Sequence, residues 1–559
     1  MERAFKKDFL ADVLKHGLFP AAFYLLTFCL LTYPLIFDFS TRFFTDAGDG
    51  MQNVWNIWWI NRAISQPGVH PSIWHTDLLH WPFGVTLLGQ TLNPFNGLSA
   101  VPLLRFMTLV QAFNTMTLFS FVMGGVTAYW LSFYLTRHIW GSLTAGFIFT
   151  FSSYHFAHYY GHMQLISLEW IPLFVLCWII LIEKPGIWIG IASALTLGLV
   201  LLCDYYYFFY CVLTGGLIVL WAMVQKRDVW FLLRKDYLAP IAVFLLISLL
   251  LAGPVVFPFM RLARIDPFLD AHKPENFSLD LLALFVPGEG WRFGQLTEAY
   301  WSKLPIGLSE ASVYLGYAVI ILLVYLWKKR RSVEFASPSQ IHMWFFLLGF
   351  FFLMALGPTL QIFGRVVYRF LMPYSLLEFL LPFLKLSGVP VRMVVMVSLA
   401  AAVLSAMALR VLFQGSTPKK YLFLLLLALL VFEYLPGTLP STSTEIPDYV
   451  NALAEMPNDG GLLDLAAPTR YLQLYYQTAH GKPLVYGYVS RLPTSVAEKE
   501  AGLTRAINRG EYVRLWDVYH IRYIATKELI EEDDPFLSIE LVYRSDGVNV
   551  YRLECECEE

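Results

Sequence analysis

Apolar residues in this chain are gathered into long runs, and polar stretches separate the runs. A helix needs about 20 mainly apolar residues to cross the hydrocarbon layer of a membrane. The run at 139–152 is short for a span, and residues 93–109 could dip into the bilayer. By this measure we predict about eleven spans, at residues 17–37, 110–135, 139–152, 164–182, 187–203, 205–224, 238–258, 311–327, 342–357, 393–413 and 421–436.

The pattern changes abruptly after residue 440, where short alternating stretches replace the long apolar runs. Residues 471–479 and 512–519 have the pattern of helices. Strands are expected at 461–465, 484–486, 521–525, 539–542 and 548–553, with a turn at Ser545-Asp546-Gly547 before the last. The predicted fold is therefore mainly α, with a polytopic transmembrane helical bundle over residues 1–440 and a small α/β domain over residues 441–559.

The composition agrees with a membrane protein, because only 15% of the 559 residues are charged and 57% are hydrophobic. Soluble domains carry about 25% charged residues. The net charge of −2 gives no indication of a nucleic-acid partner. The six cysteines form no recognisable disulfide framework, and Cys555-x-Cys557 lacks the second ligand pair of a typical metal site.

Basic residues indicate how the chain is oriented. Every second predicted connection contains Lys, Arg or both, and such loops stay in the cytoplasm. We therefore expect a multi-pass protein of the plasma (inner) membrane, with a cytoplasmic N-terminus that serves as a retained anchor and with an extracytoplasmic C-terminal domain. The long connections would then also lie outside, and loops are where function concentrates. The basic connections are Arg137-His138, Lys184, Lys226-Arg227 with Arg234-Lys235, Lys328–Arg331 and Lys419-Lys420.

The first long connection contains Thr45-Asp46-Ala47-Gly48-Asp49-Gly50, followed by a stretch with the pattern of an amphipathic interfacial helix. Asp49 precedes that helix, so capping of its N-terminus would explain one carboxylate. Two carboxylates three residues apart, flanked by glycines at a membrane surface, could also supply a base or a metal ligand.

A second group of candidates lies at 152–170. His155, His158 and His162 have a spacing that would place them on one face of a continuous helix, as metal ligands or as hydrogen-bond donors to phosphate or sugar. Alternatively, these histidines simply pack at the membrane interface. Gln164 follows these histidines. Glu169 falls inside a predicted span, where a carboxylate is costly and therefore a functional candidate. Asp204 lies between two spans.

Arginines in the predicted outer connections could bind phosphate in a bidentate manner or contact lipid headgroups. Arg392 is the strongest candidate for phosphate, because it enters a span just after a proline. Arg261, Arg264, Arg365 and Arg369 are the others, and we favour lipid contact for Arg261. Glu310, at the start of a predicted span, is a weaker acidic candidate.

These motifs, taken in order, resemble those of the GT-C superfamily of polytopic membrane glycosyltransferases, and most of all a poorly characterised bacterial branch of it. The resemblance rests on short pieces spread along nearly the whole chain: Asp46–Gly50 with Gln52-Asn53, Trp55 and Trp58; Leu92–Gly97; Phe151–Phe156 with Gly161–Gln164; Leu386–Arg392; and Gln477–Pro483 with Gly487-Tyr488.

The resemblance implies a polyprenyl-phosphate sugar donor, a lipid, glycan or protein acceptor, and a cell-envelope role. It also implies an acidic base in the first outer loop. Asp49 fits that position best and Asp46 second. Arg392, His158 and His162, with Gln164 and His155, are then candidates for the donor phosphate. The family varies in whether two acidic residues are adjacent, which leaves a divalent metal (Mg or Mn) open.

Two other classes of function compete with a transferase. A transporter or flippase of a lipid-linked glycan would need polar residues spread through several spans, whereas the last five spans are nearly free of mid-span charge. A non-catalytic envelope assembly protein would use the outer domain to bind a partner. The chain contains no P-loop, so the sequence does not support ATP-driven transport.

Overall fold

The computed structural model describes residues 12–70, 72–269, 272–333, 338–381, 384, 388–414, 420–530 and 536–555. The chain forms two compact units, and each is described by itself. The first contains residues 1–37, 115–253 and 271–439, and the second contains residues 38–114, 254–270 and 440–559. The second unit thus includes residues 38–114, which the sequence alone assigned to the membrane bundle.

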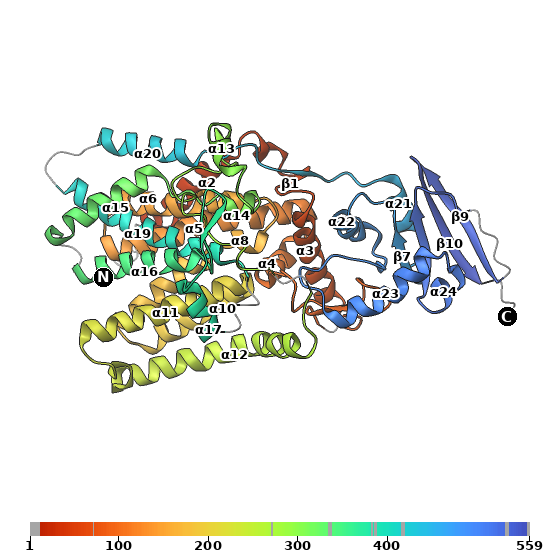
Figure 1. The fold of residues 1–559 in the computed structure, drawn as a ribbon, viewed down its shortest axis with the longest axis horizontal. Helices are drawn as coiled ribbons and strands as arrows, with labels where there is room; N and C mark the ends of the chain where they lie inside the picture. Colours follow the sequence, from red (N-terminus) through yellow and green to blue (C-terminus); the bar gives the residue numbers. More distant parts are fainter. Residues whose placement is uncertain are drawn as a thin grey trace, which may run out of the picture. The chain divides into compact units, whose positions relative to one another are not determined.

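The first unit is helical, and α19 lies at its centre among α6, α15 and α16 (Figure 1). Residues 394–409 of α19 are all buried. A second group in this unit is formed by α9, α10 and α11, which pack against one another. Its principal helices are α2 (Phe19–Leu31), α5 (Leu109–Thr136), α6 (Ile139–Thr150), α7 (Ser153–His158), α8 (Met163–Ile166), α9 (Trp170–Glu183), α10 (Ile187–Cys203), α11 (Tyr205–Lys226), α12 (Lys235–Ile265), α15 (Tyr317–Lys329), α16 (Pro338–Ala355), α19 (Val394–Phe413) and α20 (Lys420–Tyr434).

Shorter elements of the first unit lie in its connections. They are the π-helix η1 (Leu14–Leu18), the 3-10 helices η2 (Leu35–Asp38), η3 (Phe231–Leu233), η4 (Gly294–Thr297), η5 (Arg330–Ser332) and η6 (Pro390–Met393), the helices α13 (Glu298–Trp301), α14 (Leu308–Ala311) and α17 (Pro373–Leu380), and the strands β4 (Leu360–Ile362) and β5 (Arg365–Tyr368).

Apolar helices of this unit place large hydrophobic side chains on its surface, which identifies a membrane protein. In the most apolar 18-residue stretch of α12, only 17% is buried inside the protein. Leu249 and Leu250 are among the exposed residues of this helix. Water would penalise such a surface, whereas lipid stabilises it. Within the described residues, five helices are long and apolar enough to cross a membrane: Leu14–Leu31, Leu109–Thr136, Tyr205–Lys226, Lys235–Ile265 and Pro390–Phe413.

Each of the predicted spans coincides with a helix of the structure. Several of these helices are shorter than a full crossing, among them Trp170–Glu183, Ile187–Cys203, Ser339–Ala355 and Tyr421–Tyr434. The helix expected at 164–182 is divided into α8 and α9, because the backbone leaves the helical conformation at Ser167 (φ −77°, ψ 69°), between the end of α8 at Ile166 and the start of α9 at Trp170. The count of eleven crossings stays a prediction.

The second unit contains a four-stranded mixed sheet in the order β7-β8-β10-β9. β7 and β8 are parallel, and the other neighbours are antiparallel. Asp546 and Gly547 both have positive φ and join β9 to β10, as expected for a tight hairpin turn. The elements of this unit are β1 (Arg42–Phe43), α3 (Asp49–Ser65), β2 (His75–Thr76), β3 (Val85–Thr86), α4 (Pro94–Leu103), β6 (Thr442–Ser443), α21 (Asp448–Glu455), β7 (Gly461–Asp464), α22 (Arg470–His480), α23 (Thr494–Asn508), α24 (Tyr512–Asp517), β8 (Ile521–Thr526), β9 (Leu537–Ser545) and β10 (Val548–Cys555).

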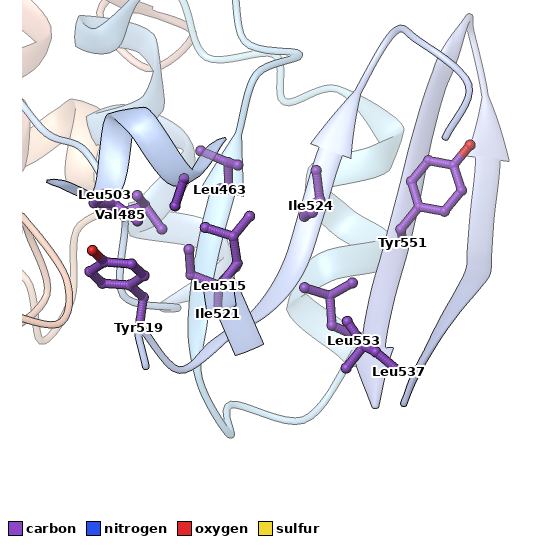
Figure 2. Close-up of a cluster of buried hydrophobic side chains, with 11 residues drawn as sticks. Leu463, Val485, Leu503, Leu515, Tyr519, Ile521, Ile524, Leu537, Tyr551 and Leu553 are labelled. Carbon is purple, nitrogen blue, oxygen red and sulfur yellow. The ribbon is translucent and has the colours of Figure 1, made fainter. Parts of the chain in front are cut away.

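Apolar side chains from the sheet and two helices form one core in this unit (Figure 2). Leu463 of β7 and Leu553 of β10 meet Leu503 of α23 and Leu515 of α24. The predicted strands match β7 to β10, except that 484–486 makes only an isolated bridge to Leu462. The sequence pattern missed α21 and α23.

Small residues allow three helices of the first unit to approach closely. A side chain at Gly146 of α6 would come within 2.0 Å of the Tyr24 hydroxyl and 2.5 Å of the Gly125 carbonyl oxygen in α5. Tyr24 of α2 is buried and donates a hydrogen bond to the Leu143 carbonyl oxygen at 3.0 Å. Close backbone approach of this kind favours helix association in membranes.

We therefore expect Gly146→Ala to overpack this contact and to lower the free energy of unfolding by about 1–3 kcal/mol. Heat or denaturant unfolding of the detergent-purified protein, followed by Trp fluorescence, measures this change. Gly216→Ala in α11 is the matched control, because nothing lies within 4 Å of a side chain added there. Equal stability of the two variants would contradict the packing argument.

Candidate functional site

The aspartate pair of the second unit begins helix α3. The Oδ1 atom of Asp46 accepts hydrogen bonds from the N–H groups of Gly48 at 3.1 Å and Gly50 at 2.9 Å. Asp49 is the first helical residue, and the N-cap position belongs to Gly48. The expectation that Asp49 caps the helix is therefore wrong, since Asp46 satisfies the N–H groups at the helix start. The helix dipole still favours a negative charge at Asp49.

Asp49 lies against two tyrosines of the C-terminal segment. The side chains of Tyr471 and Tyr488 both hydrogen-bond Asp49, and their rings are 4.5 Å apart. Burial raises the pKa of Asp46, and the nearby Asp49 charge adds to that shift. The acidic turn, which we define as Asp46 and Asp49 with Tyr471 and Tyr488, thus combines residues more than 400 positions apart.

The sequence predicted that α3 is an amphipathic helix at the membrane interface, but α3 does not expose a polar face. Gln52 donates hydrogen bonds to the hydroxyls of Thr91 at 2.6 Å and Ser490 at 2.8 Å. Trp55 donates to the Gln477 side-chain oxygen at 2.6 Å. Thr91 and polar partners from the C-terminal segment therefore attach this face of the helix and hold the acidic turn in place.

The first unit contains a separate buried ion pair. Arg392 donates to one carboxylate oxygen of Glu310 through Nε at 2.9 Å and through Nη2 at 2.5 Å. Its guanidinium also lies over the ring of Tyr206, 4.8 Å from the ring centroid. Burial alone would raise the pKa of Glu310, but the Arg392 charge outweighs burial and lowers that pKa. The charge of Arg392 is therefore balanced within the protein.

Two of the three candidate histidines lie beside this pair. Glu310 and Arg392 both act electrostatically on His158, and the rings of His158 and His162 are 5.5 Å apart. Both ring nitrogens of His158 are buried and have no hydrogen-bond partner among the described residues. Burial lowers the pKa of His158, so the ring is neutral near pH 7. We call His158, His162, Glu310 and Arg392 the buried polar cluster.

The histidines do not share one face of a helix, as their spacing had suggested. α7 ends at His158, Gly161 has a φ of 127°, and α8 begins at Met163. His155 is fully buried, and its ring nitrogens bond to the carbonyl oxygens of Thr150 at 2.6 Å and Ile166 at 2.8 Å. His155 therefore joins the two sides of this connection.

The remaining acidic and amide candidates are also buried, and Asp204 lies close enough to the ion pair for the charges of Arg392 and Glu310 to act on it. Glu169 lies directly before α9 and is fully buried, with the Cys203 sulfur 4.0 Å from its Oε1 atom. Asp204 accepts the N–H groups of Tyr206 and Tyr207 and so caps α11. Gln164 is buried in α8. Among the described residues, no group of three His, Cys, Asp or Glu side chains could hold a metal ion.

Sequence reasoning missed the three tyrosines of these groups. Tyr488 stood in a motif quoted for the family resemblance, whereas Tyr206 and Tyr471 carried no signal beyond an aromatic-rich context. Of the motif Leu386–Arg392, residues 386 and 387 lie outside the described residues.

Comparison with known proteins assigns the chain to a family. The family model "Domain of unknown function (DUF6311)" matches residues 21–432. The chain belongs to this family. No curated protein matches it.

Several solved structures are similar to this DUF6311 protein. The apo oligosaccharyltransferase of Archaeoglobus fulgidus is 12% identical, with a TM-score of 0.46, over 93% of this chain and 70% of that chain. The AglB oligosaccharyltransferase of the same organism, in complex with an inhibitory peptide and a dolichol-phosphate, is 11% identical, with a TM-score of 0.43, over 90% and 69%. Apo ArnT from Cupriavidus metallidurans is 12% identical, with a TM-score of 0.41, over 95% and 97%. Since these scores are below 0.5, we base the proposed function on the chain's own residues.

The buried ion pair generates a stability prediction. Glu310→Gln leaves the Arg392 charge buried without a counter-ion, so we expect a loss of roughly 3–5 kcal/mol in the free energy of unfolding. Glu310→Gln/Arg392→Met removes both charges and should lose much less than the sum of the single changes. Denaturant unfolding in detergent measures the free energy of unfolding of both variants. Glu298→Gln, which changes an exposed carboxylate, is the control. A Glu310→Gln variant as stable as this control would refute the prediction.

Proposed function

We propose that this DUF6311 protein is an integral membrane glycosyltransferase that moves a sugar from a polyprenyl-phosphate donor to an extracytoplasmic acceptor. In this proposal the protein is a multi-pass inner-membrane protein whose N-terminus is cytoplasmic. The observation that carries the proposal is that the two aspartates of the acidic turn make different contacts. Asp46 bonds to backbone N–H groups, and Asp49 faces two tyrosine side chains instead.

In the proposed reaction the Asp49 carboxylate accepts the proton of an acceptor hydroxyl. The hydroxyl oxygen forms a bond to the anomeric carbon of the sugar as the bond from that carbon to the phosphate oxygen breaks. The phosphate leaves with the bonding electron pair, as polyprenyl phosphate. Tyr471 and Tyr488 orient Asp49 by hydrogen bonding and are positioning residues.

As a separate proposal for the first unit, Arg392, His158 and His162 of the buried polar cluster bind a phosphate group. Glu310 uses the Nε and Nη2 groups of Arg392, so the guanidinium keeps further N–H groups for a ligand. The buried nitrogens of His158 would gain a partner. We assign no role in this to His155, whose nitrogens bond to the backbone, and we derive no step through a metal.

The first test compares the two aspartates. Asp49→Asn should reduce transfer by about 100-fold or more, because it removes the general base. Asp46→Asn should mainly weaken the helix start, at a cost of about 1 kcal/mol in stability. The assay measures release of polyprenyl phosphate by purified protein from a panel of synthetic polyprenyl-phosphate hexoses and pentoses. Full transfer by Asp49→Asn would disprove the role of Asp49.

The same assay separates the competing functions. A wild-type protein that releases no polyprenyl phosphate from any donor, but moves these lipids across vesicle membranes, is a transporter. A protein that neither releases polyprenyl phosphate nor moves these lipids behaves as a non-catalytic assembly protein would.

A second test concerns the positioning tyrosines. Tyr471→Phe/Tyr488→Phe should lower kcat by about 10-fold with little change in KM, since it loosens Asp49 without touching the donor. Tyr486→Phe is the matched control, because its hydroxyl lies 3.1 Å from Thr504 and does not bond Asp49. An unchanged kcat in the double variant would exclude the positioning role.

A further inference from the structure

A short segment of the first unit exposes apolar side chains outside the spans. It consists of β4, β5 and α17, and we call residues 360–381 the hairpin–helix segment. Leu371 is 96% exposed. The exposed apolar residues are Phe363, Val366, Val367, Tyr368, Phe370, Leu371, Leu376, Phe379 and Leu380.

This segment is anchored to the unit through its turn and β4. The N–H of Gly364 bonds to the Asp280 carboxylate at 2.8 Å, and Asp280 also accepts the Tyr300 hydroxyl at 2.9 Å. Gln361 donates to the Glu275 carbonyl oxygen at 2.7 Å. The apolar side chains of β5 and α17 therefore stay exposed while the other side of the hairpin is attached.

The chain on both sides of the segment is apolar and helical. α16 ends at Ala355, and the candidate span Pro390–Phe413 begins only nine residues after the segment. A segment tethered between such helices must lie close to the bilayer surface. Exposed aromatic and aliphatic residues with Arg365 and Arg369 beside them are typical of elements in the headgroup layer.

The segment also forms one wall of a polar cleft of about 550 Å³. Arg369 of the segment and Glu275 of the facing connection line this cleft. Neither forms an ion pair with another described residue. Gln361, which also lines the cleft, is 2% exposed, and its Oε1 atom is buried without a hydrogen-bond partner among the described residues. A buried acceptor beside two opposite charges indicates a site for a polar ligand.

From this arrangement we infer that the cleft binds the zwitterionic head of an aminophospholipid taken from the bilayer. Arg369 binds the phosphate, and Glu275 binds the ammonium group. The acyl chains extend past Val366 along the exposed apolar residues of the segment. The inference does not depend on the proposed transfer reaction.

The test measures binding of short-chain lipids to the full-length protein in detergent by calorimetry. Dihexanoyl phosphatidylethanolamine should bind at least about 10-fold more tightly than dihexanoyl phosphatidylglycerol, phosphoethanolamine or inorganic phosphate. Equal affinity for the two lipids would overturn the role of the ammonium group. Equal affinity for free phosphoethanolamine would overturn the lipid source.

Variants separate the contributions. Arg369→Gln should weaken binding of both lipids about 10-fold, and Glu275→Gln should weaken only that of phosphatidylethanolamine. Arg365→Gln, in the same hairpin–helix segment but outside the cleft, and Glu298→Gln are the matched controls. Leu371→Ser/Phe379→Ser should weaken lipid binding and leave binding of phosphoethanolamine unchanged. Wild-type affinity in Arg369→Gln or Glu275→Gln would refute the inference, whether or not the protein transfers sugar.

Discussion

Burial of α19 is the constraint on which the first unit depends. The side chains of residues 394–409 face protein on all sides, so α6, α15 and α16 must surround the helix. Lipid is as apolar as leucine, and therefore burial alone does not drive such packing in a bilayer. Close contact does, and glycines provide it. Gly141 of α6, for example, would place a side chain 2.9 Å from the Ala406 carbonyl oxygen of α19.

The buried ion pair lies at the N-terminal end of this central helix. Arg392 stands in η6, directly before α19, and Glu310 stands in α14, which packs against α7. An ion pair out of water is stable only with good geometry, and here the two N–H groups, the tyrosine ring and the neighbouring histidines provide it. The pair and the neighbouring histidines thus bring candidate residues from three connections of the first unit together.

In the second unit, polar groups at the start of a helix likewise need partners. Free N–H groups at the beginning of α3 need acceptors, and Asp46 supplies one. Asp49 is thereby available for Tyr471 and Tyr488, and the C-terminal segment becomes part of the candidate site rather than an appended domain. In the first unit, the hairpin–helix segment combines a polar attachment with an apolar surface, which suits a boundary between water and lipid.

The sequence by itself determined the helices of the bundle, because a bilayer requires long apolar runs, and it determined four strands through their alternation. It also identified Asp46, Asp49, Arg392 and Glu310 as notable, because charge beside a membrane is costly. Only the tertiary structure decided which aspartate caps α3, that Arg392 pairs with Glu310, and that residues 38–114 join the C-terminal segment. The choice of Asp46 depends on local turn geometry, since it bonds to N–H groups two and four positions further along. The other two outcomes depend on contacts between residues from about 80 to more than 400 positions apart, which leave no periodic signal in the chain. Tertiary packing also ended α7, and the spacing of the histidines gave no sign of the break at Gly161.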